Sequence, residues 1–508
     1  MLRVPNAGDF YNAGVELLGA AARRGSARVI RCGGVATSGD SLVASAFALQ
    51  ESLAAAGVRV GERVLILSRD TPCFVAAFTG ALRGGFVPVP ISTLLPPGDV
   101  AFIARDAAVR AVVVDRGLPA ELADPALYPA GAHLIAADVS SFAGVVLGAE
   151  PEAARTRAGD PAFYLYTSGT TGEPKGVVHR HVDLPVTAEC YGRGVLGLGP
   201  GDLLLSAAKL HFAYGLGNSL TFPLSLGAEV VLSPERATPE AIFALLEREK
   251  PTVFFGVPTL YAAMLAHPAL PGSLGGVRVC VSAGEALPPA LYERWLTRFG
   301  VEILDGLGST EMLHIFLSNR AGAARAGSSG VPVPGYEARI VDGDGRDVGE
   351  GEIGTLLARG DSAALAYHSR PDESARTMFE PGWLRTGDSY RRDADGFFWH
   401  VGRSDDLMKV SGQYVSPVEV EALLAAHPAV LEAAVVGQVD EHGLTKPRAF
   451  VVLAPGAQPS ERLARELQDF VKANSAPHKY PRRVDFMDEL PKTATGKIRR
   501  HLLREKAP

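Results

Sequence analysis

The chain has 508 residues, of which 47% are hydrophobic and 21% charged, a composition typical of globular proteins with more than one domain. Its 50 Lys and Arg residues against 56 Asp and Glu residues give a formal charge of −6, and no stretch of the sequence is basic enough to predict a nucleic-acid-binding surface. No run approaches the roughly 18 apolar residues of a membrane helix, and the N-terminus lacks the apolar stretch of a signal peptide.

The cysteine pattern, like the lack of a predicted membrane helix or signal peptide, is typical of a cytoplasmic protein. Cys32, Cys73, Cys190 and Cys280 are scattered without a CxxC pair, which favours reduced thiols over disulfides or metal ligands. We therefore expect a cytoplasmic protein, monomeric or homodimeric, that binds neither membranes nor nucleic acids.

Helical and strand patterns alternate along the first part of the chain. Apolar positions recur at helical spacing in residues 8–24 and again from about residue 40, and the short apolar run RVLILS (63–68) follows. Residues 99–115 repeat this order, and it resumes at 239–257. Helices separated by short, wholly apolar strands predict an α/β protein with more than one parallel sheet, each covered on both faces.

The pattern changes near residue 330. Residues 330–401 carry short strands split by Gly and Asp turns, which predicts a small β-rich subdomain. A compact α/β unit follows, with a helix at 416–426, strands near 430–437 and 447–453, and a helix at 460–474. These final hundred residues could fold as a separate domain.

The loop YTSGTTGEPKG, residues 166–176, has little to bury beyond Tyr166. Its N–H and hydroxyl groups can form a nest for phosphate oxygens, and Lys175 adds a positive charge suited to a triphosphate. The spacing GxxxxGK[ST] of a Walker loop is absent, and a polar surface linker is the alternative. By itself the loop suggests phosphate binding and leaves the chemistry open.

The segment DGLGSTEMLHIF, residues 305–316, places Glu311 directly after Ser309 and Thr310. A carboxylate beside hydroxyls suits Mg²⁺, which prefers oxygen ligands and commonly bridges to substrate phosphates. The local pattern nevertheless fits a helix N-terminus better, with Ser309 or Thr310 as the cap and Glu311 complementing the dipole.

Three further polar segments complete the set. Asp388 in WLRTGDSY could accept hydrogen bonds from ribose, and Arg403 in GRSDDLMKVSGQ could reach ribose or phosphate, although Asp and Gly also cluster in ordinary turns. Lys497 lies in the Thr- and Gly-rich segment LPKTATGKIRR, for which a solvated basic tail is the alternative.

In order and spacing, these five segments resemble the motifs of the adenylate-forming superfamily, which contains acyl- and aryl-CoA synthetases, peptide-synthetase adenylation domains and beetle luciferases. The segments KLHFAYGLGNSLTFPLSLGAEVVL (209–232), DGLGSTEMLHIFLSNR (305–320) and VSGQYVSPVEVE (410–421) are similar to the benzoate–CoA ligase branch. The resemblance spans essentially the whole chain. It implies a large N-terminal domain (1–403) of two stacked α/β-sheet subdomains plus a small β-barrel-like one, and a small mobile α/β domain (404–508) with a hinge at Asp405.

The resemblance also implies roles for individual residues. Lys497, Glu311 and Thr170 would be catalytic, with Thr170 and Glu311 near Mg²⁺ and Lys497 bridging the substrate carboxylate and phosphate. The remaining nucleotide-binding residues would be Thr167, Ser168, Gly169, Thr171, Gly172, Lys175, Ser282, Ala283, Gly284, Glu285, Asp305, Gly306, Leu307, Gly308, Ser309, Thr310, Asp388 and Arg403. The acid would be lined by Phe212, Ala213, Tyr214, Gly215, Gly306, Gly308, His314 and Ile315, and the CoA side by Lys409, Ser411, Gly412 and Gln413.

The implied reaction joins an aromatic acid to a thiol in two steps. ATP activates benzoate, anthranilate or a hydroxybenzoate to the aryl-AMP, and the thiol of coenzyme A then displaces AMP. Ala213 and the glycines of this set would leave a flat slot for the ring, and Tyr214 or His314 could bind an ortho amino or hydroxyl group. Alternatives are an aryl-AMP ligase that loads a carrier-protein pantetheine, and a nucleotide-binding regulator without catalysis; a luciferase-like monooxygenase has no positive support. VSGQ does not match every superfamily version of its turn, which weakens the CoA-side assignment.

Overall fold

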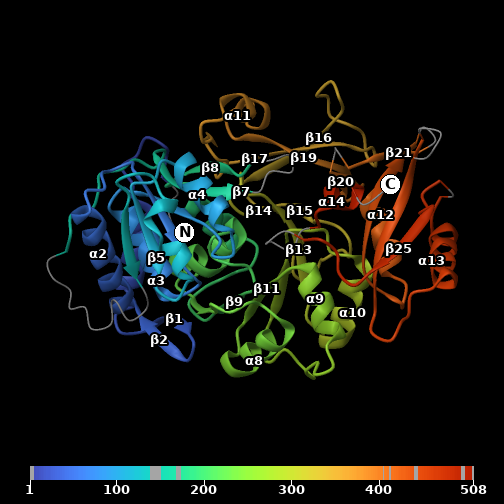
Figure 1. Cartoon of the computed structure of the whole chain (residues 1–508), viewed down its shortest axis with the longest axis horizontal. Coiled ribbons are helices and arrows are strands. Elements are labelled where there is room, and N and C mark those ends of the chain that lie inside the picture. Colours follow the sequence, from blue (N-terminus) through green and yellow to red (C-terminus); the bar gives the residue numbers. More distant parts are fainter. Residues whose placement is uncertain are drawn as a thin grey trace.

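The computed structural model describes residues 5–137, 150–167, 173–403, 406–410, 413–439, 444–476, 478–492 and 498–505. The first elements form layered α/β structure on the left of Figure 1, and the last hundred residues form a smaller unit on the right. Among the described residues, no helix combines the length and apolarity needed to cross a bilayer.

The first sheet is wholly parallel, in the order β4-β3-β5-β6. Alternate residues of its strands face two different cores, because side chains alternate across a strand. Val64 and Ile66 pack with helices α1 to α3, whereas Leu65 and Leu67 pack with α4. The bounds are β3 Arg63–Leu67, β4 Val87–Pro90, β5 Ala111–Asp115, β6 His133–Ala137, α1 Ala13–Ala22, α2 Gly39–Ala55, α3 Pro72–Arg83 and α4 Pro97–Asp106.

The second sheet has nine strands in the order β15-β14-β13-β12-β11-β9-β10-β1-β2. The strands from β13 to β1 in this order are parallel, and β14, β15 and β2 pair antiparallel at the two edges. One face packs on α8, α9 and α10. The bounds are β1 Arg28–Cys32, β2 Val35–Ser38, β9 Leu203–Ser206, β10 Glu229–Leu232, β11 Val253–Gly256, β12 Val279–Ser282, β13 Ile303–Gly308, β14 Ile315–Ser318, β15 Val331–Pro332, α8 Pro239–Glu249, α9 Pro258–Ala266 and α10 Pro289–Phe299.

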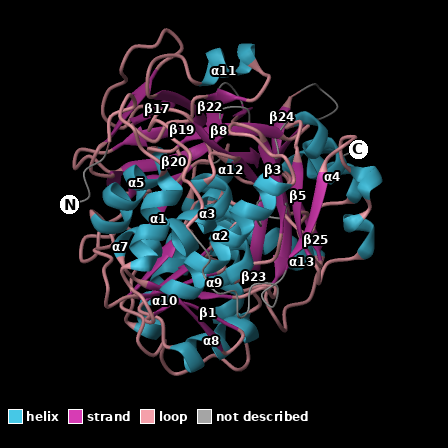
Figure 2. Ribbon diagram, turned by 90° about the vertical axis from the view of Figure 1, so that its left-hand side faces the viewer, coloured by secondary structure: helices cyan, strands magenta, loops and turns pink. Residues whose placement is uncertain are grey.

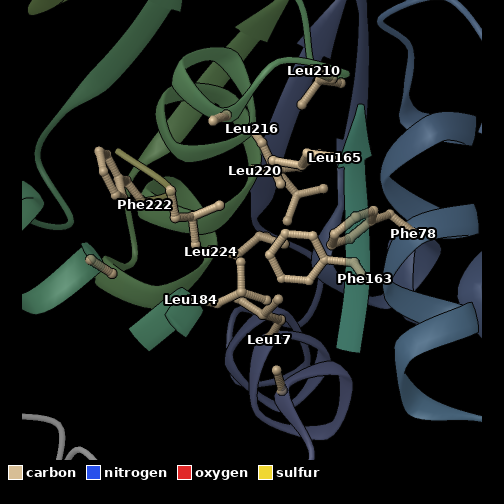
Figure 3. Close-up of a cluster of buried hydrophobic side chains, with 14 of the residues drawn as sticks. Leu17, Phe78, Phe163, Leu165, Leu184, Leu210, Leu216, Leu220, Phe222 and Leu224 are labelled. Atoms are coloured by element: carbon tan, nitrogen blue, oxygen red, sulfur yellow. The ribbon is translucent and has the colours of Figure 1, made fainter. Parts of the chain in front are cut away.

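One apolar core joins the two sheets. Figure 3 shows Phe78 and Phe163 on one side of this cluster and Phe222 on the other, with Leu216 and Leu220 between them; these residues come from segments far apart in the chain. The short helices between the sheets are α5 Asp183–Thr187, α6 Ala213–Leu216 and α7 Phe222–Leu226, interleaved with π-helical turns at Ala188–Arg193 and Gly217–Thr221; single 3-10 turns lie at Ala120–Ala123 and Pro125–Leu127.

Two antiparallel sheets lie above the large sheet in Figure 1. The four-stranded sheet β16-β17-β19-β20 is formed by the segment predicted to carry short strands. The turn after β19 is closed by the Asp393 carboxylate, which accepts the N–H groups of Asp395 and Phe397. The bounds are β16 Tyr336–Val341, β17 Gly354–Gly360, β19 Trp383–Arg392, β20 Phe398–Arg403 and α11 Pro371–Thr377, and for the three-stranded sheet β7 Pro161–Thr167, β8 Lys175–Arg180 and β18 Ala366–Tyr367.

The C-terminal unit packs apolar residues on both faces of the sheet β23-β24-β25. Its helices follow the predicted ranges closely because Ser416 and Ser460 cap them, each accepting an N–H three residues on. The first helix of the chain is shorter than expected, because Asn12 accepts two N–H groups and starts it there. The bounds are β21 Met408–Val410, β22 Gln413–Val415, α12 Pro417–Ala425, β23 Val430–Val439, β24 Thr445–Leu453, α13 Glu461–Asn474, β25 Arg483–Met487 and α14 Arg500–Glu505. Figure 2 shows α1, α2 and α3 packed together, with β3 and β5 of the first sheet to their right.

Candidate active site

The Gly- and Thr-rich loop connects the ends of a β-hairpin. Thr167 ends β7 and Lys175 begins β8, and the two residues pair across the hairpin. Near this end the hairpin is fastened to α4, where the Tyr166 hydroxyl donates to Asp106 Oδ2 at 2.6 Å. The predicted phosphate-binding residues between these ends lie outside the described part of the chain: Ser168, Gly169, Thr170, Thr171 and Gly172.

Lys175 and Glu311 come together around one tyrosine. Lys175 Nζ pairs with the Glu373 carboxylate of α11 and lies 5.8 Å from the centre of the Tyr367 ring. The Tyr367 hydroxyl donates to Glu311 Oε1 at 2.8 Å. The hydrogen bond from Lys175 lowers the pKa of Glu373, whereas burial and the Glu311 charge raise the pKa of Tyr367. Sequence analysis missed Tyr367 and Glu373, because neither lies in a recognised motif.

The segment that carries Glu311 is a turn between antiparallel strands. The prediction that Ser309 or Thr310 caps a helix is wrong, because β14 returns beside β13 and residues 309–314 must reverse the chain. The Ser309 hydroxyl accepts the Met312 N–H at 3.2 Å, and Leu313 has a φ of 65°. The Glu311 carbonyl also accepts the Ala364 N–H at 2.8 Å, which ties the turn to the segment before β18.

Asp388 and Arg403 are cross-strand partners on β19 and β20. Arg403 Nη1 lies 3.4 Å from Asp388 Oδ1, and His400 Nε2 lies 3.9 Å from the same oxygen. Gly387 has a φ of 76°, and a Cβ there would lie 2.8 Å from Arg403 Nη2, so the glycine lets the guanidinium approach. The structure therefore brings together the two residues expected to hold ribose.

The residues expected on the adenine side gather where two parallel strands end. Ser282 at the end of β12 is the register partner of Asp305 in β13. Ala283 and Gly284, the latter with a φ of 96°, lead from β12 to Glu285, while Gly306, Leu307 and Gly308 complete β13. The carboxyl ends of strands in open α/β sheets are where ligands bind.

Asp305 is a buried carboxyl group with an unusual protonation. Burial raises the pKa of Asp305 to about 8, although the Leu287 N–H, the Ser282 hydroxyl and the Gly306 N–H oppose the shift. Its side chain is thus mainly neutral at pH 7, and it can serve as a hydrogen-bond donor as well as an acceptor.

The polar residues expected around the acid share a buried aromatic cluster. The rings of Tyr214 and His314 have centroids 5.5 Å apart, and Tyr191 and Phe222 lie 5.0 and 4.6 Å from His314. Burial lowers the pKa of His314 to about 3, so the imidazole is neutral at physiological pH. Its Nε2 lies 3.1 Å from Asn218 Oδ1, which places the proton on Nε2 and leaves Nδ1 as an acceptor. Phe212, Ala213 and Ile315 lie beside these residues in sequence; Asn218 was missed by sequence analysis.

Close packing explains the glycines that were expected to leave a flat slot for the acid. A Cβ at Gly215 would lie 2.0 Å from the Lys209 carbonyl oxygen, and one at Gly308 would lie 2.8 Å from the His314 carbonyl oxygen. At Gly306 a Cβ would lie 2.8 Å from the Leu317 carbonyl oxygen. These positions need glycine for close backbone approach, so the expected flat slot gains no support from them.

The C-terminal unit contacts the large sheet through Glu285. The Ile498 N–H donates to Glu285 Oε1 at 3.1 Å. Burial raises the pKa of Glu285, while the Ile498 N–H and Arg500 oppose the shift. Arg500 Nη2 is held 2.8 and 2.7 Å from the two carboxylate oxygens of Glu421 in α12.

The remaining predicted residues of this unit are not described in full. Lys497, Asp405, Ser411 and Gly412 lie outside the described residues. For Lys409 and Gln413 the backbone is described, in the paired strands β21 and β22. Their roles stay predictions.

Comparison with known proteins shows the family. A family model described as AMP-binding enzyme matches residues 18–368, and one described as AMP-binding enzyme C-terminal domain matches residues 419–497. The benzoate–CoA ligase of Thauera aromatica is 52% identical in an alignment of 458 residues that covers 88% of this chain and 86% of that protein.

Solved structures agree with this chain over nearly its whole length. A benzoate CoA ligase from Burkholderia xenovorans LB400 matches with a TM-score of 0.91 at 47% identity, covering 97% of this chain and 100% of that one. The anthranilate CoA ligase AuaEII, in complex with anthranoyl-AMP, matches with a TM-score of 0.92 at 41% identity, covering 98% and 97%. The chain is therefore a member of the AMP-binding, adenylate-forming enzyme family, built as a large N-terminal and a small C-terminal domain.

Proposed function

We propose that this chain is an ATP-dependent aryl acid–CoA ligase. It would convert benzoate, or an amino- or hydroxy-substituted benzoate, to aryl-AMP and pyrophosphate, and would then form aryl-CoA with release of AMP. The observation that carries this function is the grouping of Lys175, Tyr367 and Glu311 at the base of the Gly- and Thr-rich loop. This grouping supports the proposal because it brings a cation and an anchored carboxylate together, and these are the two groups that would bind a triphosphate and its metal ion.

The first step needs this kind of electrostatic support. A carboxylate must attack the α-phosphate of ATP, so two anions approach each other and negative charge develops on the leaving pyrophosphate. Fixed positive charge in the site stabilises that transition state. Lys175 already faces a carboxylate, Glu373, and the incoming phosphates would replace that partner.

Glu311 has the properties expected of a magnesium ligand. Mg²⁺ is usually held by one or two carboxylates together with substrate phosphates and water. The Tyr367 hydroxyl engages Oε1 of Glu311 and fixes the orientation of the carboxylate. Thr170 would be the second group near the ion, which when bound would screen the phosphate charge.

The nucleoside and the acid would occupy neighbouring parts of the site. Asp388 and Arg403 would hold the ribose, and residues 282–285 and 305–308 would flank the adenine. His314 and Tyr214 would line the acid. The Tyr214 hydroxyl is within 3.3 Å of the Val281 carbonyl oxygen, so Nδ1 of His314 is the better acceptor for a donor group ortho to the carboxylate.

The C-terminal domain would serve both half-reactions. Lys497 would contact the carboxylate and the α-phosphate during adenylation, and rotation about Asp405 would then present the segment from Lys409 to Gln413 to pantetheine. The hydrogen bond between Ile498 and Glu285 holds the residue next to Lys497 against the large domain, as adenylation would require.

The experiment that tests the substrate class is ATP–pyrophosphate exchange with a panel of acids. We expect exchange with benzoate, 2-aminobenzoate and hydroxybenzoates, and little with short fatty acids. A clear preference for fatty acids would refute the aromatic assignment. Competition between CoA and a holo-carrier protein for the adenylate identifies the thiol acceptor.

A further inference from the structure

His179 is a buried histidine that no proposed catalytic role uses. It lies in β8, four residues after Lys175, and its side chain has no solvent exposure. Its Nδ1 lies 2.8 Å from Asp183 Oδ2, and its Nε2 lies 2.8 Å from the carbonyl oxygen of Thr310. The ring thus spans the distance from the loop-bearing hairpin to the residue just before Glu311.

The two hydrogen-bond partners, Asp183 and the Thr310 carbonyl, determine which nitrogens of the His179 ring carry a proton. A neutral imidazole has one N–H donor and one acceptor nitrogen. A backbone carbonyl oxygen can only accept, so Nε2 must carry a proton. If Asp183 is ionised, it can also only accept, so Nδ1 must carry a proton as well.

Asp183 has the surroundings of an ionised carboxylate. The Arg180 N–H donates to its Oδ2 at 2.9 Å, and Arg180 Nε donates to Oδ1 at 2.9 Å. Hydrogen bonds to the charged form favour that form. The Phe163 ring is stacked on His179, with centroids 5.1 Å apart and 17° between the planes. Because the face of an aromatic ring attracts a cation, this contact also favours the protonated form of His179.

We propose that His179 is a buried imidazolium that holds the Thr310 carbonyl and thereby positions Glu311 relative to β8 and Lys175. It is a positioning residue, because it acts through the Thr310–Glu311 backbone. The protonation state follows from the hydrogen bonds alone, whereas its importance for magnesium rests on the proposed function of Glu311.

His181 offers a matched comparison just past the end of the same strand. It is also buried, but its Nδ1 accepts the Ala13 N–H at 3.2 Å, so that nitrogen cannot carry a proton. Burial lowers the pKa of His181 to about 4. The His181 ring bonds to Ala13 in α1, whereas the His179 ring bonds to the Thr310 carbonyl. Replacing His181 therefore perturbs a similar buried site and leaves the bond between His179 and Thr310 in place.

The first experiment reads protonation directly. In protein labelled with ¹⁵N-histidine, long-range ¹H–¹⁵N correlations at about pH 7.5, above the ordinary imidazole value of about 6.5, distinguish the two states. We expect both nitrogens of His179 to be protonated and one nitrogen of His181 to be bare, with H179Q and H181Q assigning the signals. One bare nitrogen on His179 overturns the proposal.

The second experiment measures positioning. In ATP–pyrophosphate exchange, we expect H179Q to raise the Mg²⁺ concentration for half-maximal activity about tenfold, a change of about 1.4 kcal/mol, and H181Q to leave it unchanged. Equal shifts in both variants, or no shift in H179Q, would overturn the positioning role. Should H179Q fail to fold, D183N takes its place, with loss of the Nδ1 proton and the same Mg²⁺ shift expected. Absence of exchange in the wild-type protein would refute the proposed function and leave the protonation test standing.

Discussion

Tyr367 connects the two halves of the candidate phosphate site, since its hydroxyl donates to Glu311 Oε1 at 2.8 Å while its ring lies 5.8 Å from Lys175 Nζ. The tyrosine sits in β18, which pairs with β8, the strand that follows the Gly- and Thr-rich loop in the sequence. A hydrogen bond to a charged group contributes roughly 1.5–3 kcal/mol. The orientation of Glu311 therefore depends on this contact.

We predict that Tyr367→Phe lowers kcat/KM for MgATP in the adenylation step by about tenfold, because Glu311 loses its anchor. Tyr166→Phe is the matched control, since Tyr166 makes a comparable hydroxyl-to-carboxylate bond with Asp106 at 2.6 Å. Thermal unfolding shows whether the two variants are equally stable. Equal losses of kcat/KM in both would assign the effect to general destabilisation.

Lys497→Ala should separate the half-reactions. We expect adenylation, measured by ATP–pyrophosphate exchange, to fall by about 100-fold or more, because a charge that meets the developing anion is lost. Thioester formation from supplied aryl-AMP and CoA should fall far less. Lys492→Ala is the control, since Lys492 pairs with Glu432 within the C-terminal domain. Equal loss of both half-reactions in Lys497→Ala would contradict the adenylation role.

His314→Phe should change the choice of acid rather than remove activity. The neutral imidazole presents Nδ1 as an acceptor, and phenylalanine keeps the ring but has no acceptor. We expect the ratio of kcat/KM for 2-aminobenzoate over benzoate to fall by about tenfold, because the ortho donor loses its partner. An unchanged ratio would exclude His314 as the contact to the ortho group.

The raised pKa of Asp305 should make the free energy of unfolding depend on pH. Its pKa is raised to about 8 in the folded protein, against about 3.9 when unfolded, so the folded state binds more protons between these values. Its contribution is fully present below about pH 3.9 and is lost as pH rises toward 8, by about 1.4 kcal/mol per pH unit.

Urea unfolding of the wild type and Asp305→Asn from pH 5 to 8 tests this. Asparagine does not titrate, so the free energy of unfolding of the wild type should fall relative to the variant as pH rises. A difference that stays constant over this range would show that Asp305 is already ionised at pH 5.

The fold was largely predictable because its signals are local. The apolar runs that became β3 and β5 are buried on both faces, and the Gly and Asp turns of residues 330–401 separate antiparallel strands. The segment 309–311 was predicted wrongly as a helix start. Its hydroxyls and carboxylate suit a cap, and only the antiparallel return of β14 shows that the chain reverses there.

Residues of the candidate site could be predicted from sequence only where they belong to a recognisable motif. Asp388 and Arg403 do meet, as do Tyr214 and His314. Tyr367 could not be found from sequence, because its contact with Glu311 spans the distance between two sheets and leaves no pattern along the chain. The same holds for His179, whose two partners lie on separate segments.

The most direct test of the central claim is product analysis of the complete reaction. The purified protein is incubated with benzoate, ATP, Mg²⁺ and CoA, and the products are separated and identified by mass spectrometry. An aryl acid–CoA ligase gives benzoyl-CoA, AMP and pyrophosphate in equal amounts. Formation of ADP and phosphate, or accumulation of benzoyl-AMP that CoA does not consume, would contradict it.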